Sequence, residues 1–288
     1  MVIAWILFGL AGLILLSMML SQSMIRPYHC VEIDNPGNHG LQFESIEFKS
    51  PDGILLRGWW IPAERSVETV VFLHGYHGSK APDLQYAPLL HNRGYNLLLF
   101  DFRGHGSSGG NITSLGALER LDALSAVEAA VRKGSEKIGL LGFSMGGRVA
   151  VLAGGESAQV NAIVCDCGPA RISTSMELHL QKHGLPKVLS KGITWFVLFG
   201  ASVRCRVNLF AYEPILQANH LEGKPALFIQ GIKDPNICVD ETIQMVRNAG
   251  SKASLWLVDD AGHRDISDFH PQEYQARLVE FFGQALFT

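Results

Sequence analysis

Short apolar runs recur between residues 69 and 262, and each is followed by a helical or glycine-rich stretch. The runs are TVVFLHG, NLLLFDF, KIGLLGFS, NAIVCDCG, KPALFIQG and SLWLVDDAG. Strands that are nearly all Val, Ile and Leu are typical of parallel sheets buried on both faces. Apolar residues at helical spacing occur in LGALERLDALSAVEAAVRK and in QEYQARLVEFFGQALF. The pattern therefore predicts an α/β fold with a mostly parallel central sheet and helices on both faces.

The segment before these runs is organised differently. FESIEFKS alternates apolar and polar residues, Pro51-Asp52-Gly53 supplies a turn, and ILLRGWWIP follows, which predicts a hairpin. Residues 26–42 carry Pro27, Pro36 and two glycines among polar residues, and we interpret them as a linker. The folded body is thus predicted to cover residues 43–288.

The N-terminus is uncharged from Val2 to Leu20, a stretch of 19 residues, and no charge follows until Arg26. As a helix, 19 residues span about 28 Å, close to the ~30 Å hydrocarbon core of a bilayer. We therefore predict a single-pass transmembrane anchor over residues 1–25. A cleaved signal peptide and a buried soluble helix are the alternatives, although signal peptides usually begin with Lys or Arg. Arg26 alone favours a C-terminal body on the cytoplasmic side.

Composition excludes several classes of protein. The chain has 288 residues, 47% hydrophobic and 18% charged, which does not fit a disordered protein. The net charge is −3 and there is no long basic run, so the sequence gives no sign of a nucleic-acid-binding surface. Five cysteines do not form a disulfide scaffold in a chain of this length, and Cys165 and Cys167 have neither zinc nor redox spacing. We expect no metal and no cofactor.

Gly142-Phe143-Ser144-Met145-Gly146 ends one apolar run and precedes GRVAVLAGG, a predicted helix. This is the strand–turn–helix setting of the G-x-S-x-G motif, in which small residues let strand and helix approach around a nucleophilic serine. The turn also aims the Met145 N–H at the reacting carbonyl oxygen. A glycine-rich turn that arose by chance is the alternative. The motif predicts Ser144 as a nucleophile.

His74-Gly75-Tyr76-His77-Gly78 follows the first run, and here the chain resembles the α/β-hydrolase superfamily of serine type. The resemblance implies that the Tyr76 N–H is the second oxyanion-hole donor beside Met145. A metal pair formed by His74 and His77 would lack further ligands at matching spacing. The loop 101–109 resembles the family's D-x-R-G-x-G-x-S loop, which is a scaffold element.

A serine hydrolase of this type carries its residues in the order serine, acid, histidine. Asp234 follows the strand ALFIQG where the family places its acid, and His263 in Ala261-Gly262-His263 resembles the family's base. Asp166 competes for the role of acid because some members carry it one strand earlier. The resemblance thus implies Ser144, Asp234 and His263 as catalytic residues.

Residues 169–221 interrupt the alternation where the family inserts a cap. Within them, residues 193–199 (ITWFVLF) fit either the core of the cap or an acyl-chain wall or membrane-dipping face. We identify no signal that sets the oligomeric state.

The resemblance implies an esterase, lipase or thioesterase that cleaves carboxylic esters or thioesters through an acyl-enzyme on Ser144. Its partners would be a small-molecule acyl substrate and the membrane. A serine peptidase or amidase with the same residues, and a non-enzymatic binding protein on the same fold, are the alternatives. Because no motif precedes His74, we expect residues from about Pro27 onward to suffice for activity on short, water-soluble esters.

Overall fold

A central sheet organises the chain. The computed structural model of the protein describes residues 2–27, 29 and 33–287. Within them the strands are β1 (Glu44–Lys49), β2 (Leu55–Ile61), β3 (Glu68–Leu73), β4 (Asn96–Phe100), β5 (Lys137–Phe143), β6 (Val160–Asp166), β7 (Ala226–Gly231) and β8 (Ala253–Val258). They form one sheet in the order β1-β2-β4-β3-β5-β6-β7-β8. β1 and β2 form the predicted antiparallel hairpin, and β3 to β8 pair in parallel.

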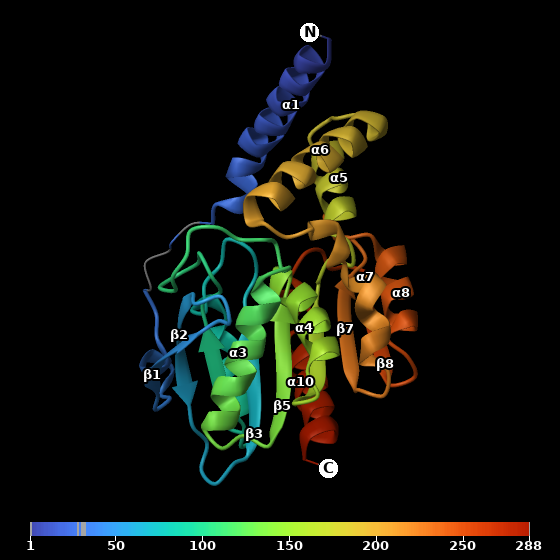
Figure 1. Cartoon of the computed structure of the whole chain (residues 1–288). Helices are drawn as coiled ribbons and strands as arrows, with labels where there is room; N and C mark the ends of the chain where they lie inside the picture. Colours follow the sequence, from blue (N-terminus) through green and yellow to red (C-terminus); the bar gives the residue numbers. More distant parts are fainter. Residues whose placement is uncertain (1, 28, 30–32, 288) are drawn as a thin grey trace.

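Helices cover both faces of this sheet (Figure 1). They are α2 (Ala87–His91), α3 (Glu119–Arg132), α4 (Met145–Glu156), α7 (Pro214–Gln217), α8 (Val239–Asn248), α9 (Ile266–Phe269) and α10 (Pro271–Leu286). Val127 of α3, Val149 of α4 and Met245 of α8 share one core, whereas Leu90 of α2 and Phe282 of α10 belong to the other. The predicted α/β fold is confirmed.

Strand β5 shows why the sheet forms in this way. Every residue of β5 after Lys137 is buried, as expected for a central parallel strand with helices on both sides. Near its start, a Cβ at Gly139 would lie 2.6 Å from the Phe282 ring of α10. The glycine therefore lets the last helix pack directly on the sheet.

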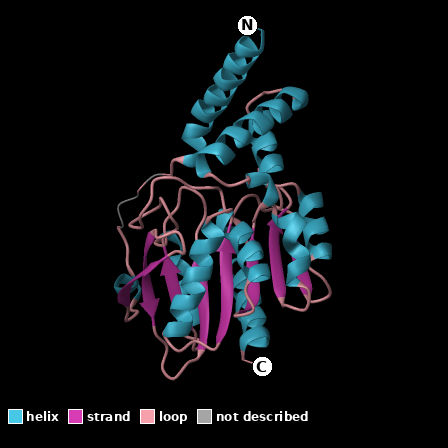
Figure 2. Cartoon of the chain, viewed as in Figure 1, coloured by secondary structure: helices cyan, strands magenta, loops and turns pink. Residues whose placement is uncertain are grey.

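The first part of the segment between β6 and β7 stands apart from the layered body (Figure 2). It holds α5 (Ile172–Lys182), α6 (Lys187–Cys205) and a short 3₁₀ helix at Leu209–Ala211, whereas the later 3₁₀ helix at Ala218–Leu221 packs into the core with α4. None of the residues of α5, all of which are described, is fully buried. We call α5 and α6 the cap helices.

The N-terminal helix α1 (Val2–Ile25) rises beside α6 (Figure 1). At their crossing the Ser17 hydroxyl donates to the Phe196 carbonyl. A Cβ at Gly200 would lie 2.3 Å from the Ser17 carbonyl carbon, so the two backbones approach where only glycine fits. By length and composition, both helices could cross a membrane: the windows Phe8–Ile25 and Lys187–Cys205 have mean hydropathies of 1.8 and 1.2.

The described part of the predicted linker runs along the body. His29 Nδ1 lies 3.0 Å from the Gly106 carbonyl oxygen. Pro36–His39 forms a 3₁₀ helix that Asn35 caps through the Gly37 N–H. Leu41 already belongs to the core beneath β2. This segment is therefore fastened to the sheet rather than extended away from it.

Candidate active site

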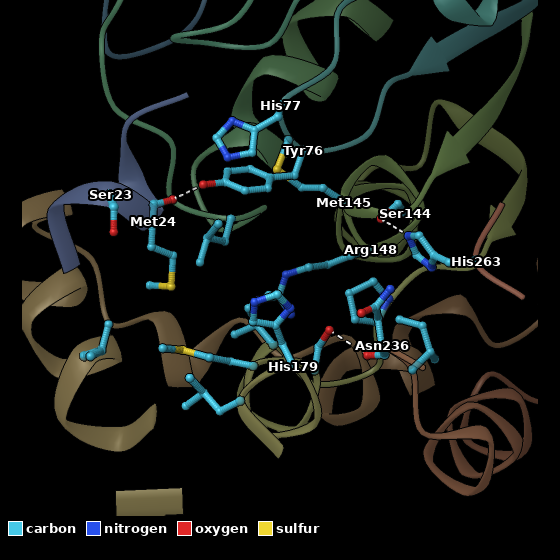
Figure 3. Close-up of a pocket in the computed structure, with 18 of the residues that line it drawn as sticks. Ser23, Met24, Tyr76, His77, Ser144, Met145, Arg148, His179, Asn236 and His263 are labelled. Atoms are coloured by element: carbon cyan, nitrogen blue, oxygen red, sulfur yellow. Dashed lines mark hydrogen bonds between the residues drawn. The ribbon is translucent and has the colours of Figure 1, made fainter. Parts of the chain in front are cut away.

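Three predicted side chains meet at the carboxyl edge of the sheet. Ser144 follows β5, Asp234 follows β7 and His263 follows β8, and the carboxyl ends of parallel strands lie at one edge. The Ser144 Oγ is 2.9 Å from the His263 Nε2, and the His263 Nδ1 is 2.6 Å from the Asp234 Oδ2 (Figure 3). The structure thus joins the three residues in one hydrogen-bonded chain.

The backbone at Ser144 is sharply bent. Its φ of 52° and ψ of −112° lie in a region that side chains other than glycine rarely adopt. Cβ atoms at Gly142 and Gly146 would lie 2.2 Å from the Gly146 oxygen and 1.8 Å from the Leu73 oxygen. Both glycines of the motif are therefore required, because backbone atoms pack against them where a side chain would not fit. The turn that they permit exposes the Ser144 hydroxyl above the sheet.

Hydrogen bonds hold Asp234 in position to orient His263. Its buried carboxylate accepts the Asn236 N–H at 2.8 Å on Oδ1 and the Gln230 amide at 3.3 Å on Oδ2. A carboxylate at Nδ1 favours the imidazole tautomer with its proton there. Nε2 is then left to accept the Ser144 hydroxyl proton.

Asp166, the competing acid, faces a different partner. It ends β6 and is buried, and its Oδ2 accepts the Tyr274 hydroxyl at 2.6 Å. Burial raises the pKa of Asp166, against the opposing effects of Arg264 and the Tyr274 hydroxyl. Its carbonyl oxygen accepts the Ser144 N–H at 2.8 Å, so its backbone supports the turn. Of the two candidate acids, Asp234 is therefore the one hydrogen-bonded to His263.

The two predicted oxyanion donors lie on segments that flank Ser144. Met145 is the first residue of α4, and the first N–H groups of a helix have no partner within it. The loop after β3 passes beside the serine, because a Cβ at Gly75 would lie 3.6 Å from the Ser144 Cβ. The next residue, Tyr76, sends its side chain into the pocket, where its hydroxyl donates to the Met24 carbonyl of α1 (Figure 3).

His74 serves the scaffold rather than a metal. Its Nδ1 lies 2.8 Å from the Gly75 oxygen, and its Nε2 accepts the Phe102 N–H at 3.0 Å. Burial, together with the neighbouring His105, lowers the pKa of His74 to about 4, so the ring is neutral at pH 7. It links the loop after β3 to the loop after β4.

A second cluster could be considered for a metal. Ligand atoms of Cys167, Asp234 and His263 lie within 4.8 Å of one another. Burial and the nearby Asp166 raise the pKa of the Cys167 thiol well above its usual range. The Cys167 thiol is buried, and His263 and Asp234 already pair at 2.6 Å, so we assign His263 and Asp234 to the hydrogen-bonded chain with Ser144.

The loop 101–109 carries a dense set of ion pairs. The buried Asp101 carboxylate accepts the Lys80 ammonium at 2.6 Å and the Ser107 N–H at 2.9 Å. Arg103 bridges the carboxylates of Asp122 and Asp52 at 2.7 and 2.6 Å. These contacts agree with the predicted scaffold role.

A pocket of about 650 Å³ opens onto Ser144 and His263. Its walls are mostly apolar and come from the end of α1, the start of α4 and the cap helices α5 and α6. Figure 3 shows Met24 and Tyr76 on the far side of this space from His263. This contribution of α1 was not predicted, because no sequence motif marks it.

Arg148 was also missed. It lies one turn beyond Ser144 on α4 and is fully buried, and its guanidinium donates to Glu213 at 2.6 Å and to the Tyr212 carbonyl. Glu213 in turn accepts the Ile172 N–H at 2.9 Å. This ion pair therefore joins both ends of the cap to the helix that begins at the serine.

A serine on a strained strand–helix turn, with a histidine and a carboxylate from later strands of a parallel sheet, defines a hydrolase architecture. A family model, the alpha/beta hydrolase family, matches residues 70–280. The chain belongs to this family. It is 27% identical over 254 residues to the uncharacterized protein YfhR of Escherichia coli O157:H7, covering 84% of this chain and 81% of that protein.

Solved and curated relatives include enzymes. The esterase Pf2001 of Pyrococcus furiosus superposes with a TM-score of 0.77 at 29% identity, covering 91% of this chain and 98% of the esterase. Dipeptidyl peptidase family member 6 of Caenorhabditis elegans is 29% identical over 75% of this chain and 31% of its own length. Family and neighbours together support a hydrolase.

Proposed function

We propose that this protein is a serine hydrolase that cleaves carboxylic esters or thioesters through an acyl-enzyme on Ser144. The observation that carries the proposal is the hydrogen-bonded chain from the Ser144 Oγ through His263 to Asp234, at 2.9 and 2.6 Å. It stands at a strained turn beside an apolar pocket. This is the arrangement that activates a hydroxyl for attack on an acyl carbon.

The reaction follows from the geometry. The Ser144 oxygen bonds to the acyl carbon while the His263 Nε2 takes its proton, and Asp234 stabilises the imidazolium. The N–H groups of Tyr76 and Met145 bind the oxyanion, and one such donor lowers the barrier by about 3–4 kcal/mol. The imidazolium then gives its proton to the leaving alcohol or thiol. Water repeats the sequence with His263 as base and releases the acid.

A serine peptidase is the second candidate, favoured by the likeness to a dipeptidyl peptidase family member. A peptidase that recognises the free N-terminus of its substrate needs a carboxylate to pair with that amine. The described residues that line the pocket include no Asp or Glu, and apolar side chains predominate. This composition favours an acyl ester over a peptide amine.

We also propose that α1 anchors the protein in a membrane, with the body on the cytoplasmic side. Trp5 and Phe8 of α1 are 74% and 73% exposed, and a bilayer would cover these apolar side chains. Arg26 follows the helix and supports the orientation. Resistance to carbonate extraction tests the anchor, and protease treatment of intact cells tests the side.

A fluorophosphonate probe and a substrate panel test the enzymatic proposal. The purified protein should become labelled, and it should hydrolyse p-nitrophenyl esters faster than peptide p-nitroanilides. Labelling with a preference for the anilides would instead support the peptidase. A folded protein without labelling or turnover would be a binding protein on the hydrolase fold.

A further inference from the structure

The last turns of α1 form one wall of the pocket that holds Ser144. Leu20, Ser23 and Met24 line it from α1, whereas Met176 of α5 and Val197 of α6 line it from the cap. Figure 3 shows Ser23 and Met24 on a helix end that borders the same space as Ser144 and His263. The N-terminal helix is therefore part of the substrate site as well as a candidate anchor.

Specific contacts hold this end of α1 against the site. The Tyr76 hydroxyl donates to the Met24 carbonyl, and the Thr113 N–H donates to the Ile25 carbonyl at 2.8 Å. Both carbonyls belong to the last turn of a helix, where they have no partner within the helix. Higher up, the contact between Ser17 and Gly200 fixes α1 on α6. The helix α1 is thus held both at its last turn and at its crossing with α6.

The outer surface of α1 and α6 is apolar and is bordered by positive charge. On α6, Val188, Trp195 and Phe199 are 88%, 50% and 47% exposed. Residues 169–212 carry six Lys and Arg but one acidic residue, Glu177, although the whole chain has a net charge of −3. Lys187 and Lys191 are exposed beside the apolar face. An apolar face with basic neighbours suits a bilayer that contains anionic lipids.

The position of the pocket along α1 is consistent with a substrate in the bilayer. If the 24 residues of α1 cross a bilayer, the end of the helix at Ile25 lies at the membrane surface. Ester groups of lipids lie in this interfacial layer, outside the ~30 Å hydrocarbon core. The pocket borders the same end of the helix, so a lipid ester can reach Ser144 while its chain stays in apolar surroundings.

We infer that the substrate is a long-chain acyl ester or thioester taken from a bilayer, and that its chain lies between the last turns of α1 and the cap helices. The inference rests on the proposed function and names the substrate class of the same site. It makes Leu20 and Val197 determinants of acyl-chain specificity.

Leu20→Trp in the full-length protein tests the wall. The added ring would fill the space between α1 and α6 and exclude a long chain. In vesicles of phosphatidylcholine with one-fifth phosphatidylglycerol, kcat/KM for p-nitrophenyl palmitate relative to butyrate should fall by about tenfold or more, the scale of a misfit in an apolar pocket. Met19→Trp is the matched control, because Met19 is the preceding residue, is 72% exposed and does not line the pocket. It should leave the ratio unchanged.

The vesicle surface is tested separately. Lys187→Gln together with Lys191→Gln should lower palmitate turnover on the anionic vesicles by a few-fold, because α1 keeps the protein in the vesicle and the lysines act only by holding the cap helices against its surface. Turnover of soluble butyrate should not change, and Lys252→Gln, outside the cap, should have no effect.

Three outcomes separate the proposals. An unchanged palmitate-to-butyrate ratio in Leu20→Trp, or an equal fall on both esters, would overturn the acyl wall. Palmitate turnover that is insensitive to the lysines and to phosphatidylglycerol would overturn the contact of the cap helices with the bilayer surface. Absence of both fluorophosphonate labelling and ester turnover in the unaltered protein would instead overturn the proposed function itself.

Discussion

The pocket has two sides that are built in different ways. On the sheet side, the Asp234 side chain is buried, Ser144 is half-buried, and a Cβ at Gly146 would lie 1.8 Å from the Leu73 oxygen. On the helical side, α5 has no fully buried residue and α6 exposes Trp195 and Phe199. The backbone is closely packed on the first side, whereas the second side carries exposed apolar side chains.

This difference assigns the two sides different tasks. Positioning a hydroxyl, an imidazole and two N–H groups tolerates little movement. Enclosing an acyl chain requires apolar area, which many side chains provide. Changes on the sheet side should therefore affect all substrates equally, whereas changes on the helical side should affect substrates according to chain length.

The largest expected effect is on the sheet side. Ser144→Ala removes the proposed nucleophile and should lower kcat by about 10⁶-fold for every ester, whatever its chain length. Fluorophosphonate labelling should vanish, while the circular dichroism spectrum stays unchanged. Unchanged ester hydrolysis by a folded Ser144→Ala protein would show that the chemistry does not run through Ser144.

The next effect separates two carboxylates at the same edge. Asp234→Asn should lower kcat by about 10⁴-fold, because the amide favours the wrong tautomer of His263. Asp166→Asn should leave kcat nearly intact, since its side chain bonds Tyr274. Steady-state kinetics on p-nitrophenyl butyrate compares the two variants, and a reversed order of effects would assign the acid to the strand before the cap.

Arg148 lies where the two sides join. Arg148→Met leaves Glu213 buried without its guanidinium and should lower the free energy of unfolding by about 3–5 kcal/mol. Adding Glu213→Gln removes the unpaired charge while keeping an acceptor for the Ile172 N–H, and should recover part of the loss. Urea denaturation of the single and double variants measures the coupling, and additive losses would mean that the pair is not linked.

The smallest expected effect concerns pH. The pKa of His74 is about 4 in the folded protein, against an ordinary value of 6.5. Between these values the unfolded chain binds a proton that the folded protein does not, so stability falls as the pH drops, by about 1.4 kcal/mol per unit and about 3 kcal/mol in all. His74→Gln, whose oxygen can accept the Phe102 N–H, should lose less stability between pH 7 and 5. An identical slope in both proteins would argue against a neutral buried His74.

The sheet side could be predicted from the sequence because its signals are local. Ser144 sits between glycines that the turn requires, and the apolar runs report burial on both faces. The helical side could not be predicted in this way. Ser17 meets Gly200 across 183 positions in the chain, and Arg148 meets Glu213 across 65, with no motif at either end. We still expect residues from Pro27 onward to suffice for turnover of short esters. Turnover of long-chain esters should also depend on Leu20 and Met24, because these residues line the pocket.

Glu213 lies at the base of the cap and joins its two ends. It accepts the Ile172 N–H at the entry to the cap, next to Tyr212 at the exit, so the insertion leaves and returns at a single point. A segment closed at its base in this way can change length or be exchanged while the strands beneath keep their register. Because the Ser17 hydroxyl of α1 also donates to the Phe196 carbonyl of α6, a different cap grafted between positions 172 and 213 would have to preserve the contact with α1.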